Sequence, residues 1–158
     1  MPPGQSNDAQ PCVREGRAKS GAPLNFTLGR FKQRTIRMLD HILFDVNDLE
    51  KSKVFYKAAL APLGYELIYE VNGSVGFGAN GSIDFCIQGG KQIVPGIHFA
   101  FRSDSRAKVR AFYEAAIKAG GKDNGPPGIR EHYHSNYYGA FVIDINGHNI
   151  EAVCHNPE

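Results

Sequence analysis

Long apolar runs are missing from this chain of 158 residues. A membrane-spanning helix needs about 20 consecutive apolar residues, and no window of the sequence approaches that length. Tryptophan is absent, and only three cysteines occur, with no Cys-x-x-Cys pair. Three scattered thiols cannot form a disulfide framework, and the first ten residues lack the apolar stretch of a secretory signal. We therefore expect no membrane partner and a reducing, cytoplasmic location.

Charge of one sign is not in large excess, because 18 Lys and Arg residues stand against 16 Asp and Glu residues. The near balance hides an asymmetry: residues 1–37 hold seven basic and two acidic side chains, whereas residues 38–158 hold 11 and 14. The first segment is rich in Pro, Gly, Ser and Gln and shows no helical or strand periodicity, so we predict a disordered basic N-terminal extension. The mildly acidic remainder argues against nucleic acid as a partner.

An internal repeat is the most informative feature of the sequence. Shifted by 57 residues, the segment 41–64 aligns without a gap with the segment 98–121, and eight of the 24 aligned pairs are identical. Each copy begins with a short apolar strand. Asp48 or Ser105 follows as a helix N-cap, then an amphipathic helix of 13–16 residues that ends at glycine.

After each predicted helix the pattern becomes that of β-strands. Asn-Gly pairs at 72–73, 80–81 and 146–147 separate the strands, and such pairs between alternating runs are typical of hairpins. Residues 122–136 are too rich in Pro and Gly for a helix, and predict a short strand plus a long loop. We therefore predict an α+β fold of two tandem βαβββ modules, which pair curved mixed sheets around a central cleft with the helices outside. Module one spans residues 38–88, the linker 89–95 and module two 96–155.

Two histidines and one glutamate are the candidate metal ligands. Side chains alternate between the two faces of a strand, so Glu151 lies opposite the apolar Ile150 and Ala152 in the last predicted strand. A buried carboxylate is costly unless it is paired or bound to a cation. His41 and His98 occupy the same position in the two repeats, so pseudo-twofold symmetry places them equivalently. Two imidazoles and a carboxylate suit a divalent metal ion such as Zn, Ni, Mn or Fe.

The chain resembles the glyoxalase/bleomycin-resistance/extradiol-dioxygenase (vicinal oxygen chelate) superfamily in three segments, LDHILFDVNDLEKSKVFYKAALAPLGYELIYE, GIHFAF and YYGAFVIDINGHNIEAV. The resemblance implies a metal between paired modules, with ligands from the first and fourth strands of each, and a possible homodimer. Carried over to this sequence, the ligands are His41, His98 and Glu151, and the fourth is open. Aligning SIDFCI on NIEAVC pairs Asp84 with Glu151, whereas aligning the Asn-Gly turns pairs Phe85 with it.

The loop REHYHSNYY (130–138) holds further polar side chains near the expected cleft. Long loops on a rigid scaffold often carry binding residues, and His and Tyr can donate protons. We predict Glu151, His134 and Tyr138 as the catalytic residues. His148, in a hairpin turn, is expected to be exposed, and Cys86 and Cys154 are expected to pack within strands.

Three functions fit such a cleft and a small-molecule substrate. The first is a metal-dependent lyase or isomerase of the glyoxalase kind, which chelates two vicinal oxygens of a small carbonyl or thiol-conjugate substrate. The second is an extradiol-type ring-cleaving dioxygenase with a two-His-one-carboxylate site. The third is a non-enzymatic protein that sequesters a drug-like molecule. We expect the first.

Overall fold

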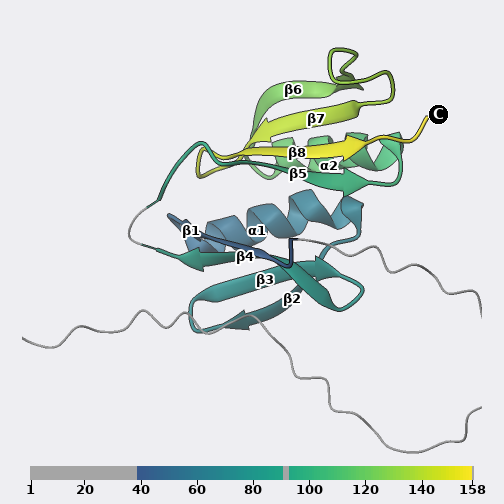
Figure 1. The fold of residues 1–158 in the computed structure, drawn as a ribbon. Helices are drawn as coiled ribbons and strands as arrows, with labels where there is room; N and C mark the ends of the chain where they lie inside the picture. The colour runs from purple at the N-terminus through teal and green to yellow at the C-terminus, as the bar shows by residue number, and fades with distance from the viewer. Residues whose placement is uncertain (1–38, 91–92, 158) are drawn as a thin grey trace, which may run out of the picture. The chain divides into compact units, whose positions relative to one another are not determined.

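The structure is a computed structural model that describes residues 39–90 and 93–157. Residues Asp40–Glu158 form one compact unit, and the predicted extension of residues 1–37 lies outside the described residues. Figure 1 shows one strand, one helix and three strands, and then the same series again. The fold prediction is confirmed: there are two four-stranded mixed sheets with the two helices outside them.

Module one builds a sheet in which its first strand lies beside its last. Its elements are β1 (Ile42–Val46), α1 (Leu49–Leu60), the short 3-10 helix η1 (Ala61–Leu63), β2 (Glu66–Val71), β3 (Ser74–Ala79) and β4 (Ser82–Gly89). The strand order is β1-β4-β3-β2, with β1 parallel to β4 and the other pairs antiparallel. Helix α1 connects β1 to β2, and the chain then runs through β3 to place β4 beside β1 as a parallel pair.

Module two repeats this topology. Its elements are β5 (His98–Ser103), α2 (Arg106–Lys118), β6 (Lys122–Ile129), β7 (Tyr138–Ile143) and β8 (Asn149–Cys154). The order is β5-β8-β7-β6, again with the first and last strands parallel. Strand β6 and the loop after it confirm the strand-plus-loop prediction for residues 122–136.

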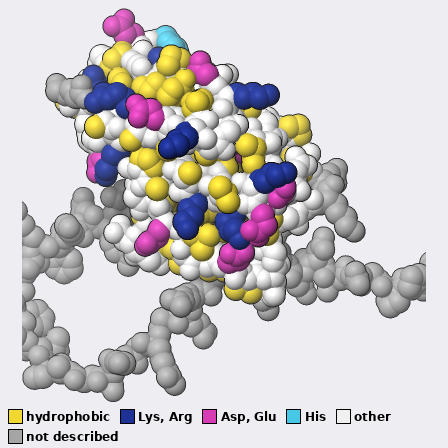
Figure 2. Space-filling view, turned by 180° about the vertical axis from the view of Figure 1, so that it is seen from behind, with side chains coloured by type: hydrophobic (Ala, Val, Ile, Leu, Met, Phe, Trp, Pro, Cys, Tyr) yellow, Lys and Arg dark blue, Asp and Glu magenta, His cyan; other side chains and the backbone are white. Residues whose placement is uncertain are grey.

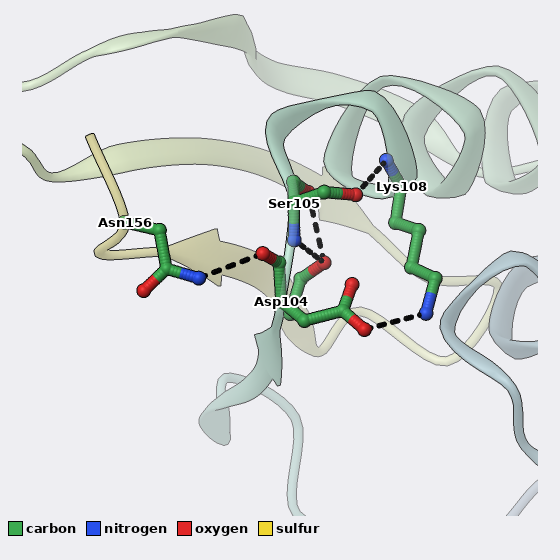
Figure 3. Close-up of polar contacts among 5 residues, drawn as sticks. Asp104, Ser105, Lys108 and Asn156 are labelled. Carbon is green, nitrogen blue, oxygen red and sulfur yellow. Dashed lines mark hydrogen bonds and ion pairs between the residues drawn. The ribbon is translucent and has the colours of Figure 1, made fainter. Parts of the chain in front are cut away.

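Both helices begin at the predicted caps. The Asp48 carboxylate accepts the backbone N–H of Lys51 at 3.0 Å, and the Ser105 hydroxyl accepts that of Lys108 at 3.3 Å (Figure 3). The Lys108 ammonium also reaches back to the Asp104 carboxylate at 2.9 Å. Each cap satisfies a backbone donor that the first helical turn leaves without an intrahelical acceptor.

Replacing Ser105 with alanine is expected to lower the free energy of unfolding by about 1 kcal/mol, because the capping acceptor is lost. The matched variant Ser105→Gly is expected to cost only about a few tenths of that, since glycine leaves the amide open to water. Urea denaturation of both variants tests the difference. Equal stability of Ser105→Ala and the natural chain would show that this cap contributes nothing.

Two of the three Asn-Gly pairs form turns in which both residues have positive φ. Asn72 and Gly73 have φ of 50° and 78°, and Asn80 and Gly81 have 55° and 74°. Positive φ at both central positions is the type I′ geometry, which matches the twist of the flanking strands. These turns connect β2 to β3 and β3 to β4, so the hairpins predicted from the sequence are confirmed.

The two modules share a single hydrophobic core rather than building one each. Ring centroids of Phe44 and Phe99 lie 5.6 Å apart, and those of Phe85 and Phe101 lie 5.2 Å apart, which joins strands of module one to β5. Helix α1 also packs against α2. A curved four-stranded sheet with one helix cannot bury enough apolar surface alone, so each module completes the other.

A buried polar cluster also links the modules at the turn between β7 and β8. The Asp144 carboxylate accepts the Tyr56 hydroxyl of α1, and the Asn146 amide donates to the Ser52 hydroxyl at 3.1 Å. In return, the backbone N–H of Asn47 donates to the Asn146 side-chain oxygen at 3.1 Å. A turn of module two is thus hydrogen-bonded to the first helix of module one.

His148 lies in the same turn, and the expectation that it is exposed is wrong. Its side chain is fully buried, with its ring 5.0 Å from that of Phe44 in an edge-on contact. Its backbone N–H donates to the Asp144 carboxylate at 2.8 Å. Hairpin turns are usually exposed, but this one packs against the neighbouring module and is buried there.

The surface carries both signs of charge. Figure 2 shows one face on which Lys and Arg side chains lie interspersed with Asp and Glu side chains. In the described part of the chain, no helix combines the length and the apolar character needed to cross a bilayer.

Candidate functional site

Each sheet has one face toward the helices and one polar face, and Glu151 lies on the polar face of module two. In β8, Ile150, Ala152 and Cys154 belong to the hydrophobic core, whereas Glu151 and Val153 do not. The alternation predicted from the sequence is therefore confirmed. Glu151 is nevertheless 99% buried, with 1% of its surface exposed. A carboxylate in such a place requires partners.

His98 is the first partner of Glu151. His98 lies on β5, which runs parallel to β8, the strand of Glu151. Its Nε2 atom lies 3.4 Å from Oε2 of Glu151. The other ring nitrogen, Nδ1, lies 3.1 Å from the backbone oxygen of Asn149. Because a carbonyl oxygen only accepts, Nδ1 carries a proton, and Nε2 is left to face the carboxylate, as a lone pair in the neutral ring or as a second N–H donor in the charged ring.

Tyr137 is the second partner, and the sequence did not single it out. Its hydroxyl donates to Oε1 of Glu151 at 2.6 Å. Burial raises the pKa of the Glu151 carboxyl, against the opposing effects of the Tyr137 hydrogen bond and of the charges on His98 and Arg130. Burial, together with the nearby carboxylate, also raises the pKa of Tyr137 well above its usual value. Tyr137 therefore remains a protonated donor that holds one oxygen of Glu151 in place.

The predicted catalytic residue Tyr138 lies elsewhere. Its hydroxyl accepts from the Arg110 guanidinium at 3.5 Å, and the Arg106 guanidinium lies 5.2 Å from its ring centre. Both arginines belong to α2, so Tyr138 faces the helix while Tyr137 faces Glu151. Adjacent residues of an extended chain point to opposite faces. The Tyr-Tyr pair in the sequence does not by itself indicate which ring faces the site.

His134 is brought near this group through the loop. Its Nδ1 accepts the backbone N–H of Asn136 at 3.2 Å, and its Nε2 lies 2.8 Å from Nδ1 of His155. His134 therefore donates to His155. The Tyr137 ring contacts both imidazoles, with centroids 5.5 Å from His134 and 5.2 Å from His155. Burial, with the charges of His134 and Arg102, lowers the pKa of His155.

His41 is not gathered with the other predicted ligands. Its Nδ1 lies 2.8 Å from the carboxylate of the neighbouring Asp40. Within residues 39–90 and 93–157, no three His, Cys, Asp or Glu side chains approach closely enough to hold a metal ion. Within one chain, His41 therefore does not join His98 and Glu151 in a three-ligand group among these residues, and its role as a ligand stays a prediction.

The strand register decides how Asp84 relates to Glu151. In module two, Glu151 lies opposite Ala100, two residues after His98. The corresponding place in module one is opposite Leu43, and Cys86 occupies it. Neither Asp84 nor Phe85, the two residues that the sequence alignments offered, therefore occupies the place in module one that is equivalent to Glu151. Asp84 instead accepts the Tyr65 hydroxyl at 3.0 Å. The β3–β4 pairing has one extra residue in β4 between Ile83 and Phe85 that the β7–β8 pairing lacks, and this bulge accounts for the one-residue difference between Cys86 and the turn-based alignment on Phe85.

The His98–Glu151 pair suits a metal ion chemically but supplies only two ligand atoms. A histidine ligand typically donates its other ring N–H to a backbone carbonyl, as His98 does to Asn149. Two ligand atoms at about 2.1 Å from a tetrahedral ion lie roughly 3.4 Å apart, which is the spacing of Nε2 and Oε2. The donor set is thus half of a site, with at least one further ligand needed.

The fold and this half-site define a paired βαβββ protein with a buried carboxylate and an imidazole on its polar face. The family model described as Glyoxalase/Bleomycin resistance protein/Dioxygenase superfamily matches residues 38–152. The chain belongs to this superfamily.

Solved structures agree with this assignment. A glyoxalase/bleomycin resistance protein from Albidiferax ferrireducens T118 is 29% identical, with a TM-score of 0.68, over 75% of this chain and 99% of its own. A fosfomycin resistance protein, FosX, from Listeria monocytogenes shares the fold at 24% identity and a TM-score of 0.58, over 75% of this chain and 93% of its own. A glyoxalase-related enzyme from Fulvimarina pelagi shares it at 20% identity and 0.59, over 75% and 88%. No curated protein matches.

Proposed function

We propose that this protein is a metal-dependent enzyme of the glyoxalase kind, a lyase or isomerase that holds a small substrate through two neighbouring oxygen atoms. The observation that carries the proposal is the His98–Glu151 pair, in which a backbone carbonyl holds Nδ1 of His98 and Nε2 lies 3.4 Å from a carboxylate oxygen. With the proton on Nδ1, the Nε2 lone pair and Oε2 form two adjacent ligand atoms for a metal ion. Membership of a superfamily whose members often use divalent metals supports the same conclusion.

The missing ligand is His41 of a second copy of this chain. His41 has the same place in module one that His98 has in module two, yet it lies apart from Glu151 in a single chain. The polar faces also expose apolar side chains to solvent: Leu43, in the middle of β1, is 40% exposed, and Ala100 in β5 is exposed. A twofold dimer that pairs these faces covers both residues and forms two equivalent sites.

Each side chain then has a distinct task. His98, Glu151 and the partner's His41 would hold the metal, which when bound supplies a Lewis acid that polarises substrate oxygens. Tyr137 holds Oε1 of Glu151 and leaves Oε2 to face His98. The hydrogen-bonded His134–His155 pair places a group that can take up or release a proton beside Tyr137.

A ring-cleaving dioxygenase is the second candidate, because Cys86 stands in module one where a second carboxylate ligand would be needed for a four-ligand site. Module one offers no carboxylate at the position equivalent to Glu151. The proposed ligand set therefore consists of two histidines and one carboxylate, the set of non-haem iron oxygenases. A four-ligand site of the kind that favours the isomerase reaction would need Cys86 as a ligand.

Elemental analysis of the full chain purified without chelator tests the metal site. We expect about one divalent metal ion per chain, and only traces in His98→Ala. Because His98 is half exposed, this variant should still unfold cooperatively. The matched control His132→Ala, in the exposed loop, should keep the metal. Unchanged metal content in His98→Ala refutes the site, and a metal-free natural chain favours a sequestering protein.

Turnover assays then separate the two enzymes. The metal-loaded chain is offered the methylglyoxal–glutathione adduct under one condition, and catechol with dioxygen under another. Turnover of the adduct supports the lyase or isomerase, and ring cleavage of catechol supports the dioxygenase. Either activity should disappear in His98→Ala and persist in His132→Ala.

A further inference from the structure

Arg130, at the end of β6, is held rigidly on the polar face of module two. Its Nη2 donates to the backbone oxygen of Pro126 at 2.6 Å, and its guanidinium carbon lies 5.5 Å from the centre of the Phe141 ring. A Cβ atom at Gly128 would lie 2.9 Å from Nη1, and one at Gly125 3.3 Å from Nη2. Two glycines therefore leave the space that the guanidinium occupies.

The same guanidinium is close to the proposed metal ligands. Phe141 lies opposite Glu151 in the register of β7 and β8, and its ring stacks with that of His98 at a centroid distance of 6.3 Å. The Phe141 ring is therefore flanked by His98 and by Arg130. The charge of Arg130 is also near enough to act on the Glu151 carboxyl.

Among the residues that the structure describes, Arg130 forms no ion pair with a carboxylate. Within residues 39–90 and 93–157, backbone oxygens alone, those of Pro126 and Ile129, accept its hydrogen bonds. Carbonyls fix the guanidinium without neutralising its charge. A fixed guanidinium without an ion-pair partner, beside a ligand pair, has the properties of an anion-binding group.

We propose that Arg130 binds a carboxylate of the substrate, so that the substrate is a small carboxylic acid that also carries two vicinal oxygens. This inference rests on the proposed function, because it places those oxygens at the His98–Glu151 pair. A single guanidinium, part of whose donors are used by carbonyls, suits a singly charged carboxylate better than a doubly charged phosphate group.

Isothermal titration of the zinc-loaded full chain tests the subsite with matched probes. Catechol presents vicinal oxygens alone, 2,3- and 3,4-dihydroxybenzoate add a carboxylate at two distances, and the corresponding amides are neutral controls. We expect one of the two carboxylates to bind about tenfold or more tightly than its amide. Arg130→Gln should reduce this ratio to near one, and because carboxylate and amide share the same vicinal oxygens, the ratio is independent of any effect of the lost charge on Glu151.

Two further variants complete the design. Lys122→Gln removes one positive charge from an exposed position of the same strand and should preserve the carboxylate preference. Arg130→Lys keeps the charge but loses the planar fork, so an intermediate preference is expected. Thermal unfolding of each variant establishes that it is folded.

The possible failures are distinguishable. If neither carboxylate is preferred over its amide, or if the preference survives in folded Arg130→Gln, the Arg130 subsite is refuted while catechol binding still supports the metal site. If catechol and every other probe fail to bind the zinc-loaded chain, the proposed function itself fails.

Discussion

Mixing His41→Ala chains with His98→Ala chains is expected to restore metal binding that neither variant has alone. In a twofold dimer each site takes His41 from one chain and His98 with Glu151 from the other. A mixed dimer then has one site that lacks both histidines and one that is complete. Random exchange of subunits should restore about a quarter of the sites of the natural protein.

This experiment distinguishes a third ligand supplied by the same chain from one supplied by a second chain. If each chain built its own site, every chain in the mixture would carry a defect, and no metal would be recovered. A mixture of His98→Ala with Glu151→Gln is the matched control, because both changes fall in the same half-site and mixing cannot restore it. Elemental analysis after unfolding, mixing and refolding gives the result. Absence of recovery in the first mixture would contradict a shared site.

Replacing Asp144 with alanine is expected to destabilise the protein by about 3–5 kcal/mol, because several buried donors lose their acceptor together. Its carboxylate accepts the Tyr56 hydroxyl and the backbone N–H groups of Asn146 and His148, both at 2.8 Å. Tyr56 is fully buried, so water cannot replace the lost acceptor. Urea denaturation followed by circular dichroism measures the loss.

Two variants calibrate that result. Tyr56→Phe removes one donor and leaves the others bonded, so it should cost about 1–2 kcal/mol. Glu131→Ala removes a carboxylate from an exposed loop position and should change stability by less than about 0.5 kcal/mol. If Asp144→Ala is no more destabilising than Glu131→Ala, the turn between β7 and β8 does not hold the modules together.

The elements of the fold were predictable because their signals are local. Local signals include the helix caps at Asp48 and Ser105 and the turns at Asn72 and Asn80. Each depends on neighbours within a few residues, and together they mark the boundaries of the elements in each repeat. Such signals act on the backbone directly, through one hydrogen bond or one dihedral angle. The alternation that places Glu151 on the polar face is local in the same sense.

The candidate site was only partly predictable, because contacts across strands decide it. The sequence indicated His98 and Glu151, which the structure brings together, and it indicated Tyr138 where the structure places Tyr137 beside the carboxylate. It also offered Asp84 or Phe85 for the place equivalent to Glu151, whereas the strand register gives that place to Cys86. Register depends on pairing between strands, which a single strand's sequence does not show.

By itself, the sequence determined the duplication, the two βαβββ modules and the presence of a buried carboxylate that needs a partner. The tertiary structure alone decided which faces of the modules meet. Aromatic side chains on the helix-facing sides, such as Phe44 and Phe99, merge into one core, and among the described residues His41 does not join His98 and Glu151 in a three-ligand group. The physical reason is that hydrophobic association depends on area rather than direction. A repeat pattern gives the apolar area of each module, but not the side on which two modules bury it.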